Sequence, residues 1–353
     1  MSALAKLRDV QSSDYNPTNR YFEIQNRRYL GNKNALLSFI QSVVTEKCAD
    51  YTSFCDIFSG TGVVGNHFNT PNVKIISNDI LKSNYVSLST FLESVDLELR
   101  RISHLIDGLN KLPMMPCNYF AEHFSNTFFT EVNASKIGTI RDGIDCLGVP
   151  ETEKNALITS LLYAADKVAN TCGHYDAFVK HLDKEQVIRL LAPKVKAQCN
   201  QNNEVYNEDA NLLIKKINCD VLYLDPPYNS RQYSDAYHLL ENLVTWKKPE
   251  VFGKAKKMDR THIKSKYCMN SAPQAFADLI AYADCKHILL SYNNTGDSKG
   301  GRSNARITDE QIFETLNKRG KVQVFEQEYR AFTTGKSSKD GNVERLFYCK
   351  VQK

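Results

Sequence analysis

A run of mostly apolar residues, Cys219-Asp-Val-Leu-Tyr-Leu224, ends in the tetrapeptide Asp225-Pro226-Pro227-Tyr228. The run has the length and composition of a strand that is buried on both faces, as parallel strands are. Its two prolines fix φ and disfavour a helix, so the tetrapeptide is expected to form a rigid turn. In an open α/β sheet, ligands bind at the carboxyl ends of the strands. The sequence therefore predicts a parallel α/β sheet with a carboxylate and an aromatic ring at its ligand-binding edge.

The tetrapeptide has the groups needed to bind a flat ring that carries an exocyclic amino group. The Asp225 carboxylate and the Pro226 carbonyl can accept the two N–H bonds of one nitrogen, and Tyr228 can stack on the ring. A strand that simply ends in a proline turn would show the same four residues. The tetrapeptide needs a second motif before it can be read as an active site.

The second motif lies in residues 51–65, which are predicted to form a strand, a glycine-rich turn and the start of a helix. Asp56 ends the strand, and the turn contains Gly60, Gly62 and Gly65. Glycine lets the backbone approach a ligand closely, and a helix start offers unpaired N–H groups to an anion. The turn lacks the Lys-Ser/Thr ending of a phosphate-binding loop, which disfavours ATP. Its spacing partly resembles a dinucleotide fingerprint, so NAD remains an alternative at this point.

The next predicted strand, residues 73–79, ends in Asp79, whose carboxylate could accept hydrogen bonds from ribose hydroxyls. This acid fits an adenosine cofactor or NAD. Together with the tetrapeptide, these motifs resemble those of the S-adenosylmethionine-dependent DNA adenine methyltransferases of the alpha arrangement (D12 type), typical of bacterial restriction–modification systems and phage. The resemblance runs from about Arg28 to the C-terminus, and four motifs occur in the family's order.

The resemblance implies roles for individual residues. Lys33, in Tyr29-Leu-Gly31-Asn-Lys33, would meet the carboxylate of the cofactor's methionine; the family has Gly-Gly-Lys or Gly-Ser-Lys at this place. Asp209, preferred to Glu208, would contact the adenine amino group of the cofactor. The implied catalytic residues are Asp225, Pro226, Pro227 and Tyr228. The implied cofactor-binding residues are Tyr29, Gly31, Lys33, Asp56, Phe58, Gly60, Gly62, Asp79 and Asp209.

The reaction implied is transfer of a methyl group from S-adenosylmethionine to the amino group of an adenine flipped out of double-stranded DNA. In-line transfer needs no metal, and no convincing set of metal ligands is present. An enzyme acting on the cytosine amino group would be expected to carry Ser at position 225, and an RNA-directed enzyme more often Asn. A dehydrogenase would leave the tetrapeptide without a role. A non-catalytic DNA-binding relative should have lost motifs that are intact here.

Strands and helices are predicted to alternate up to about residue 84, and again from residue 205, as in a doubly wound sheet. The resemblance implies a mixed seven-stranded, Rossmann-like methyltransferase sheet. The catalytic domain would comprise residues 1–82 and 204–353, and its last two strands, 322–329 and 344–351, would form an antiparallel pair. Residues 83–203 read as mainly helical and would be an inserted target-recognition domain.

The formal net charge of +5 says little about partners, but the basic residues cluster between residues 247 and 266. This segment is predicted to contact DNA phosphates, and a solvated surface loop is the alternative. Ser291-Tyr-Asn-Asn294, at the end of a later strand, is expected to line the substrate pocket. The proposed DNA-binding residues are Arg231, Lys254, Lys256, Lys257, Arg260 and Lys264.

With 353 residues and 42% hydrophobic content, the chain can bury a full α/β core and a second domain. Its ten cysteines are scattered without C-x-x-C spacing, which disfavours disulfides and zinc. The N-terminus is too short and polar for a signal peptide, and no apolar stretch has membrane-spanning length. The sequence thus predicts a cytoplasmic, DNA-associated bacterial or phage enzyme, with a cognate restriction endonuclease as a functional partner.

Overall fold

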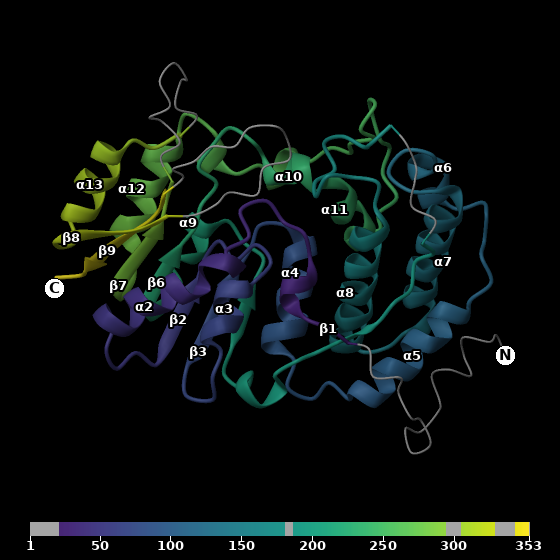
Figure 1. Ribbon diagram of the computed structural model, residues 1–353, viewed down its shortest axis with the longest axis horizontal. Helices are drawn as coiled ribbons and strands as arrows, with labels where there is room; N and C mark the ends of the chain where they lie inside the picture. Colours follow the sequence, from purple (N-terminus) through teal and green to yellow (C-terminus); the bar gives the residue numbers. More distant parts are fainter. Residues whose placement is uncertain (1–20, 181–185, 294–304, 329–342, 353) are drawn as a thin grey trace. The chain divides into compact units, whose positions relative to one another are not determined.

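The computed structural model describes residues 21–180, 186–293, 305–328 and 343–352. These residues form two compact units, whose elements are labelled in Figure 1. The sheet unit consists of the described residues within 33–80, 202–233 and 261–352. The helical unit consists of those within 21–32, 81–201 and 234–260.

In the described part of the sheet unit, seven strands form one mixed sheet in the order β5-β3-β2-β6-β7-β9-β8. The first five strands in this order pair in parallel, whereas β9 is antiparallel to both β7 and β8. The predicted mixed sheet and its closing antiparallel pair are confirmed. The strands are β2 (Ser53–Asp56), β3 (Lys74–Asn78), β5 (Glu204–Tyr206), β6 (Asn218–Leu224), β7 (Asp284–Ser291), β8 (Val322–Glu328) and β9 (Val343–Lys350).

The strand β6 lies in the middle of this sheet, between β2 and β7, and all its residues except Asn218 are buried. In a parallel sheet both faces are covered, which explains why the sequence of β6 is apolar rather than alternating. The central position also explains why the tetrapeptide after β6 lies among the ends of neighbouring strands.

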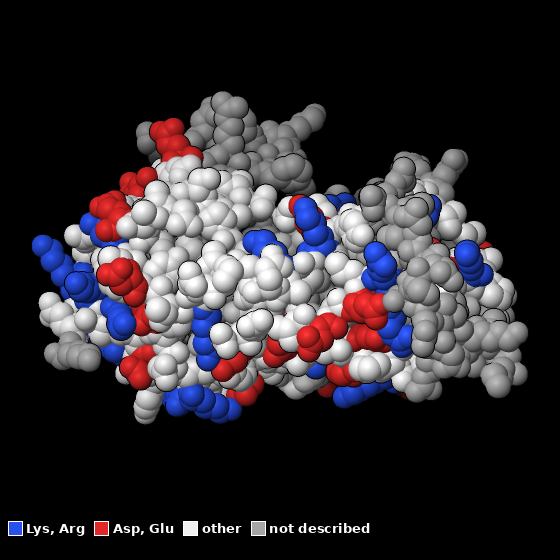
Figure 2. All heavy atoms as spheres, turned by 90° about the horizontal axis from the view of Figure 1, so that it is seen from below, with Lys and Arg blue, Asp and Glu red and all other residues white. Residues whose placement is uncertain are grey.

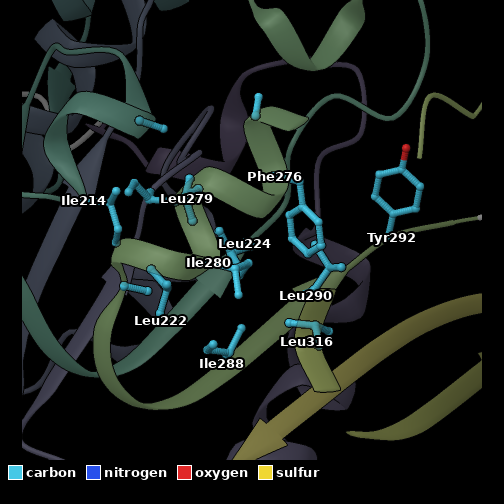
Figure 3. Close-up of a cluster of buried hydrophobic side chains, with 14 of the residues drawn as sticks. Ile214, Leu222, Leu224, Phe276, Leu279, Ile280, Ile288, Leu290, Tyr292 and Leu316 are labelled. Atoms are coloured by element: carbon cyan, nitrogen blue, oxygen red, sulfur yellow. The ribbon is translucent and has the colours of Figure 1, made fainter. Parts of the chain in front are cut away.

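Helices cover both faces of the sheet. On one face lie α9 (Ala210–Leu213), α12 (Ala272–Tyr282) and α13 (Asp309–Asn317), and Figure 3 shows their side chains packed with those of β6 and β7. The labelled core residues there include Leu222, Leu224, Phe276, Leu279, Ile280, Ile288, Leu290 and Leu316. On the other face lie α2 (Leu37–Lys47), which follows the 3₁₀ turn η3 (Asn34–Leu36), and α3 (Val63–Phe68).

Aromatic stacking fixes α3 against that second face. The rings of Phe54 in β2 and Phe68 in α3 are stacked with their centroids 4.3 Å apart. Phe54 also stacks on Tyr223 of β6, with the centroids 6.2 Å apart. These residues alternate along their strands with Cys55 and Leu222, which face the first core. The two faces are thus filled by alternate residues of the same strands.

The helical unit contains α4, α5, α6, α7, α8 and α11, and a short parallel pair, β1 and β4. Within it, α7 packs between α6 and α8, and α4 packs against α8 and α11. A π-helical turn, η4 (Ser89–Glu93), follows α4, and α10 (Tyr233–Ala236) precedes α11. The bounds are α4 (Lys82–Leu88), α5 (Leu99–Lys111), α6 (Tyr119–Phe124), α7 (Glu131–Leu147), α8 (Glu151–Val168), α11 (His238–Thr245), β1 (Tyr21–Phe22) and β4 (Ala192–Pro193).

Local sequence signals set the boundaries of these helices. The Thr130 side chain accepts a hydrogen bond from the Asn133 N–H and so caps the start of α7. The helix ends at Gly148, whose φ of 57° is costly for other residues. Pro150 then precedes α8, where a proline is tolerated because the first N–H groups of a helix have no partner. Among the residues that the structure describes, no helix is both long and apolar enough to cross a membrane.

The compact units have different boundaries from the predicted domains. Residues 21–32 and 234–260, which the prediction placed in the catalytic domain, belong to the helical unit. The Arg28 guanidinium and backbone N–H bind Asp166 of α8, and Glu241 of α11 accepts hydrogen bonds from the Lys82 and Ser83 N–H groups. These contacts tie both segments to helices of the predicted insertion. The target-recognition role of the insertion stays a prediction.

Candidate active site

Three carboxylates gather at the carboxyl edge of the sheet. Asp56 ends β2, Asp79 follows β3 and Asp225 follows β6, and the three strands are parallel neighbours. Burial raises the pKa of Asp56 well above its ordinary value, and the negative charges of Asp225 and Asp79 raise it further. The edge therefore brings together acidic groups that oppose one another's ionisation.

A buried lysine links Asp225 to a fourth carboxylate. The Lys33 Nζ lies 3.2 Å from Asp225 Oδ1 and 2.8 Å from Glu344 Oε1. Burial alone would lower the pKa of Lys33, but the two carboxylates outweigh burial and raise it above its ordinary value. Lys33 is therefore a cation. Its ammonium was predicted to meet the cofactor's methionine carboxylate, and the structure places two protein carboxylates around it.

The surroundings of Asp225 bring its pKa closer to neutral pH than that of an ordinary aspartate. Burial raises its pKa to about 6, Lys33 opposes the rise, and Glu344 adds to it. At neutral pH the carboxylate is mostly ionised, yet it binds a proton more readily than an ordinary aspartate does. It is thus suited first to accept hydrogen bonds and then to accept a proton.

The glycine-rich turn has the backbone geometry that its sequence predicts. Gly60 and Gly62 have φ angles of 53° and 82°, in the left-handed region that favours glycine. The Gly60 N–H donates to Asp79 Oδ2 at 2.9 Å, and the Gly62 N–H donates to the Ser59 carbonyl at 2.7 Å. Asp79, the predicted ribose-binding acid, is therefore fixed directly to the predicted cofactor loop.

Asn78, which the sequence analysis did not single out, locks three strand ends together. Its Nδ2 donates to the carbonyls of Ile57 and Glu208, both at 3.1 Å, and its Oδ1 accepts from the Glu208 N–H at 3.0 Å. The segment after β5 is thereby held beside the loop after β2. In that segment Asp209 caps α9, because its Oδ1 accepts from the Asn211 N–H at 2.9 Å.

Two aromatic residues predicted for the site are half-buried at the same edge. Phe58 packs edge-on against Tyr267, with the ring centroids 4.9 Å apart. Tyr228 lies edge-on to Tyr292, with the centroids 6.3 Å apart. The Tyr228 carbonyl accepts hydrogen bonds from the Arg306 N–H at 2.9 Å and from the Tyr292 hydroxyl at 3.3 Å. The end of the tetrapeptide is therefore held by the segment after β7; the predicted pocket-lining role of Tyr292 stays a prediction, and Asn294 lies outside the described residues.

Tyr29 and Gly31 belong to the helical unit, unlike the other predicted cofactor-binding residues. The Tyr29 ring stacks on Tyr237, with the centroids 4.5 Å apart, and its hydroxyl accepts from Asn84 Nδ2 at 3.0 Å. Gly31 has a φ of 73°. The structure thus gives Tyr29 packing partners within the helical unit.

The predicted DNA-binding residues fall into two groups. Lys257 pairs with Asp176 at 2.8 Å, and Arg260 pairs with Asp235, so both have carboxylate partners inside the helical unit. Of the others, Arg231, Lys254 and Lys264 are exposed, whereas Lys256 is half-buried, as Lys257 and Arg260 are. On the face drawn in Figure 2, basic and acidic side chains lie next to each other in several places. Lys257 and Arg260 would therefore have to exchange a carboxylate partner for a phosphate in order to bind DNA as predicted.

Glu344 is the main site residue that the sequence analysis missed. It lies in β9, is 7% exposed, and accepts a hydrogen bond from Ser291 Oγ at 3.2 Å in addition to its pair with Lys33. A signal was present, because Glu344 alternates with Leu346 and Tyr348 along the strand, and an acid in such a series of buried positions is unusual. What it contacts depends on strand pairing, which the sequence pattern does not give.

Comparison with known proteins identifies the family. Residues 29–296 match the family model described as D12 class N6 adenine-specific DNA methyltransferase. The chain is 33% identical to Type II methyltransferase M.NlaIII of Neisseria lactamica, over 88% of this chain and 93% of that protein.

Two longer proteins are also similar. The chain is 32% identical to Type II methyltransferase M.FokI of Planomicrobium okeanokoites and 31% identical to modification methylase LlaI of Lactococcus lactis subsp. lactis. The matches cover 91% and 90% of this chain but 52% and 53% of those proteins, so it spans about half the length of each. The family, reaction class and DNA substrate predicted from the motifs are confirmed. The chain belongs to the D12 class of N6 adenine-specific DNA methyltransferases.

Proposed function

We propose that the methyl donor is S-adenosylmethionine and that the carboxyl edge of the sheet unit binds it together with the amino group of a flipped-out adenine. The observation that carries this proposal is the group of carboxylates Asp56, Asp79 and Asp225 at that edge. Such a site favours a ligand with positive charge, as the sulfonium and ammonium groups of S-adenosylmethionine have. It disfavours the negatively charged diphosphate of NAD.

Asp56 provides a specific test of the fit. Its Oδ1 is buried and has no hydrogen-bond partner in the described structure. A buried acceptor without a donor costs about 1–3 kcal/mol. The ammonium group of the cofactor's methionine could donate to this oxygen, and its charge would offset the repulsion among the three carboxylates.

The remaining predicted contacts are compatible with this arrangement. The Gly60 N–H holds Asp79 Oδ2, which fixes this carboxylate beside the glycine-rich turn, where we propose that it meets the ribose hydroxyls. Lys33 has three N–H donors, so the predicted contact with the methionine carboxylate would use the one that faces neither Asp225 nor Glu344. We retain the predicted cofactor contacts of Tyr29, Gly31, Phe58, Gly62 and Asp209.

The reaction requires that the adenine amino group become a better nucleophile, because its lone pair is delocalised into the ring. Hydrogen bonds from its two N–H groups to Asp225 and to the Pro226 carbonyl favour a pyramidal nitrogen, while Tyr228 stacks on the base. When bound, S-adenosylmethionine supplies an electrophilic methyl group, and the electrons of the broken S–C bond stay on sulfur as the N–C bond forms. The nitrogen then loses a proton, for which Asp225 is the nearby acceptor.

The biological role that we propose is protection of DNA in a bacterial or phage restriction–modification system. The similarity to Type II methyltransferases and a modification methylase supports it. A cognate endonuclease would then recognise the same site. The enzyme would act in the cytoplasm, where that DNA lies.

The proposal is tested by incubating unmethylated DNA with purified protein and S-adenosylmethionine, followed by nucleoside mass spectrometry. We expect N6-methyladenine with the wild type, and a loss of about 10²–10⁴-fold in rate for Asp225→Ala. The matched control is Asp284→Ala, which removes an exposed carboxylate from β7 and should retain activity. A folded wild type that methylates no base, or binds no S-adenosylmethionine, would refute the proposal.

A further inference from the structure

We infer that Glu344 is a positioning residue for methyl transfer, which holds the Lys33 ammonium against Asp225 and so fixes the orientation and charge of the Asp225 carboxylate. The inference rests on the proposed role of Asp225. Glu344 lies outside residues 29–296, the part of the chain that matches the family model. It is 311 residues from Lys33 in the sequence and is brought to it by the fold.

The position of Glu344 is fixed by the sheet. It lies at the start of β9, and β9 pairs with the end of β7, where Ser291 is opposite Leu346. Ser291 Oγ and Lys33 Nζ both donate to the same oxygen, Glu344 Oε1, at 3.2 and 2.8 Å. One carboxylate oxygen therefore anchors the lysine, and the lysine in turn contacts Asp225 Oδ1.

A purely structural role explains this arrangement poorly. Burying an ion pair costs desolvation energy, and an apolar residue of similar volume often stabilises a fold as well or better. The neighbours of Glu344 in β9 include Leu346 and Phe347, so an apolar residue would suit the strand. The buried acid instead adds a second negative charge to the Lys33–Asp225 pair.

This second charge has a definite effect on Asp225. Two carboxylates share one ammonium, so the pull of Lys33 on Asp225 is divided, and Glu344 raises the pKa of Asp225. The other titratable groups around Asp225 are Asp56 from β2, Tyr223 of its own strand and Tyr228 of the tetrapeptide. Removing the charge of Glu344 should therefore lower the pKa of Asp225. It should also free the lysine to move.

The test is Glu344→Gln, which keeps the shape of the side chain and removes its charge. We expect kcat to fall by about 10–100-fold, as for other residues that orient a functional side chain. The acid limb of the kcat/KM profile should move to lower pH, and the dissociation constant for S-adenosylmethionine should stay within about threefold. Glu344→Asp, which restores the charge, should return the limb toward the wild-type pH. The matched control is Glu326→Gln, an exposed glutamate on the neighbouring strand β8.

Each outcome decides a separate question. If the wild type does not methylate adenine, the proposed function fails before the inference is reached. If the wild type is active and Glu344→Gln has the same kcat and pH profile, the inference is overturned. If Glu344→Gln does not fold, Ser291→Ala decides, because it removes one anchor of Glu344 without leaving a charge unpaired. A wild-type kcat and pH profile for Ser291→Ala would then overturn the inference.

Discussion

The proposed role of Asp225 requires its carboxylate to be ionised, whereas burial and the charge of Glu344 favour the protonated form. In the proposed reaction, the ionised carboxylate is the stronger acceptor for the adenine amino N–H groups, and only this form can later take up the proton. Because the pKa of Asp225 is raised to about 6, its ionised fraction decreases around that pH, at which many enzymes remain folded. We therefore expect the pH dependence of activity to report the protonation of Asp225.

At the residue scale, we expect kcat/KM of the wild type to fall about tenfold per pH unit below pH 6, as Asp225 becomes protonated. Lys33 lowers the pKa of Asp225, so Lys33→Gln should move this limb to higher pH, opposite to the effect of Glu344→Gln. Steady-state rates between pH 5 and 8, with circular dichroism as the control for folding, measure both shifts. If the acid limb of the kcat/KM profile moves in the same direction for Lys33→Gln and Glu344→Gln, the proposed effects of the two charges on Asp225 are wrong.

Residues that act through local sequence could be predicted, whereas those that act through strand pairing could not. The tetrapeptide and the glycines signal a turn by their own backbone preferences; the glycine-rich turn is present, and the tetrapeptide follows β6 as irregular backbone. Glu344 and Asn78 act by contacting segments far away in the sequence. No pattern within β9 reveals that its acid will meet Lys33.

At the scale of elements, Asp220 fastens the amino end of β6 to β2. Its Oδ2 accepts hydrogen bonds from the N–H groups of Thr52 and Ser53, at 2.7 and 3.2 Å, and Lys286 lies 2.7 Å from Oδ1. Burial would raise the pKa of Asp220, but hydrogen bonds from Lys286 and Thr52 outweigh it and hold the pKa well below its ordinary value. This acidic residue in an apolar strand thus holds β6 to β2, at the edge opposite to Asp56 and Asp225.

We expect Asp220→Ala to lower the free energy of unfolding by about 1–3 kcal/mol at pH 7, because it leaves N–H groups without an acceptor. Since the folded-state pKa is lowered, this contribution is present above the ordinary aspartate pKa and is lost as pH falls through the lowered value. Urea unfolding at pH 7 and in acid measures the difference, with the exposed Asp284→Ala as control. Equal stability of Asp220→Ala and the wild type at pH 7 would refute the role.

The second element is the basic segment between residues 247 and 266, whose predicted contact with DNA can be tested separately. Residues Phe252 and Lys257 form a small hairpin through two backbone hydrogen bonds of 2.8 and 2.9 Å, and Lys254 and Lys256 lie in its turn. If these two lysines bind phosphates, the Lys254→Gln, Lys256→Gln double variant should bind DNA more weakly. Its slope of log affinity against log salt should become shallower by about 0.9 for each phosphate that is no longer neutralised.

Fluorescence anisotropy of labelled DNA across a salt series measures this slope. Lys318→Gln is the matched control, because Lys318 is an exposed lysine at the end of α13 that pairs with Glu314. An unchanged slope in the double variant would show that the hairpin is a solvated surface segment.

Most strands of the sheet unit could be predicted from the sequence, but its helix α12 could not. The predicted strands that end at Leu224 and near Ser291 correspond to β6 and β7, and those at 322–329 and 344–351 correspond to β8 and β9. Helix α12 has Pro273 in its first turn, where proline is tolerated, and no helix was predicted for this segment. Its role became clear only from the core, in which Phe276, Leu279 and Ile280 cover β6 and β7 (Figure 3).

At the scale of the whole molecule, the sequence pattern indicates where the alternation of strands and helices stops. The boundaries of the two compact units lie at other residues. Helix α11 follows a strand of the sheet in the sequence, yet it packs with α4 and α8. Contacts such as those between Glu241 and Ser83, which are 158 residues apart, set the unit boundaries. Periodicity reports which residues are buried, and it does not report what buries them.

The order of strands has a consequence for synthesis on the ribosome. β9 follows β8 in the chain but lies between β7 and β8 in the sheet. While residues 343–350 are still being translated, β7 has an open edge, and β8 has been made before the strand with which it pairs. Glu344 arrives with the same strand. The same strand that joins β8 to the sheet thus also brings Glu344 to the charges around Asp225.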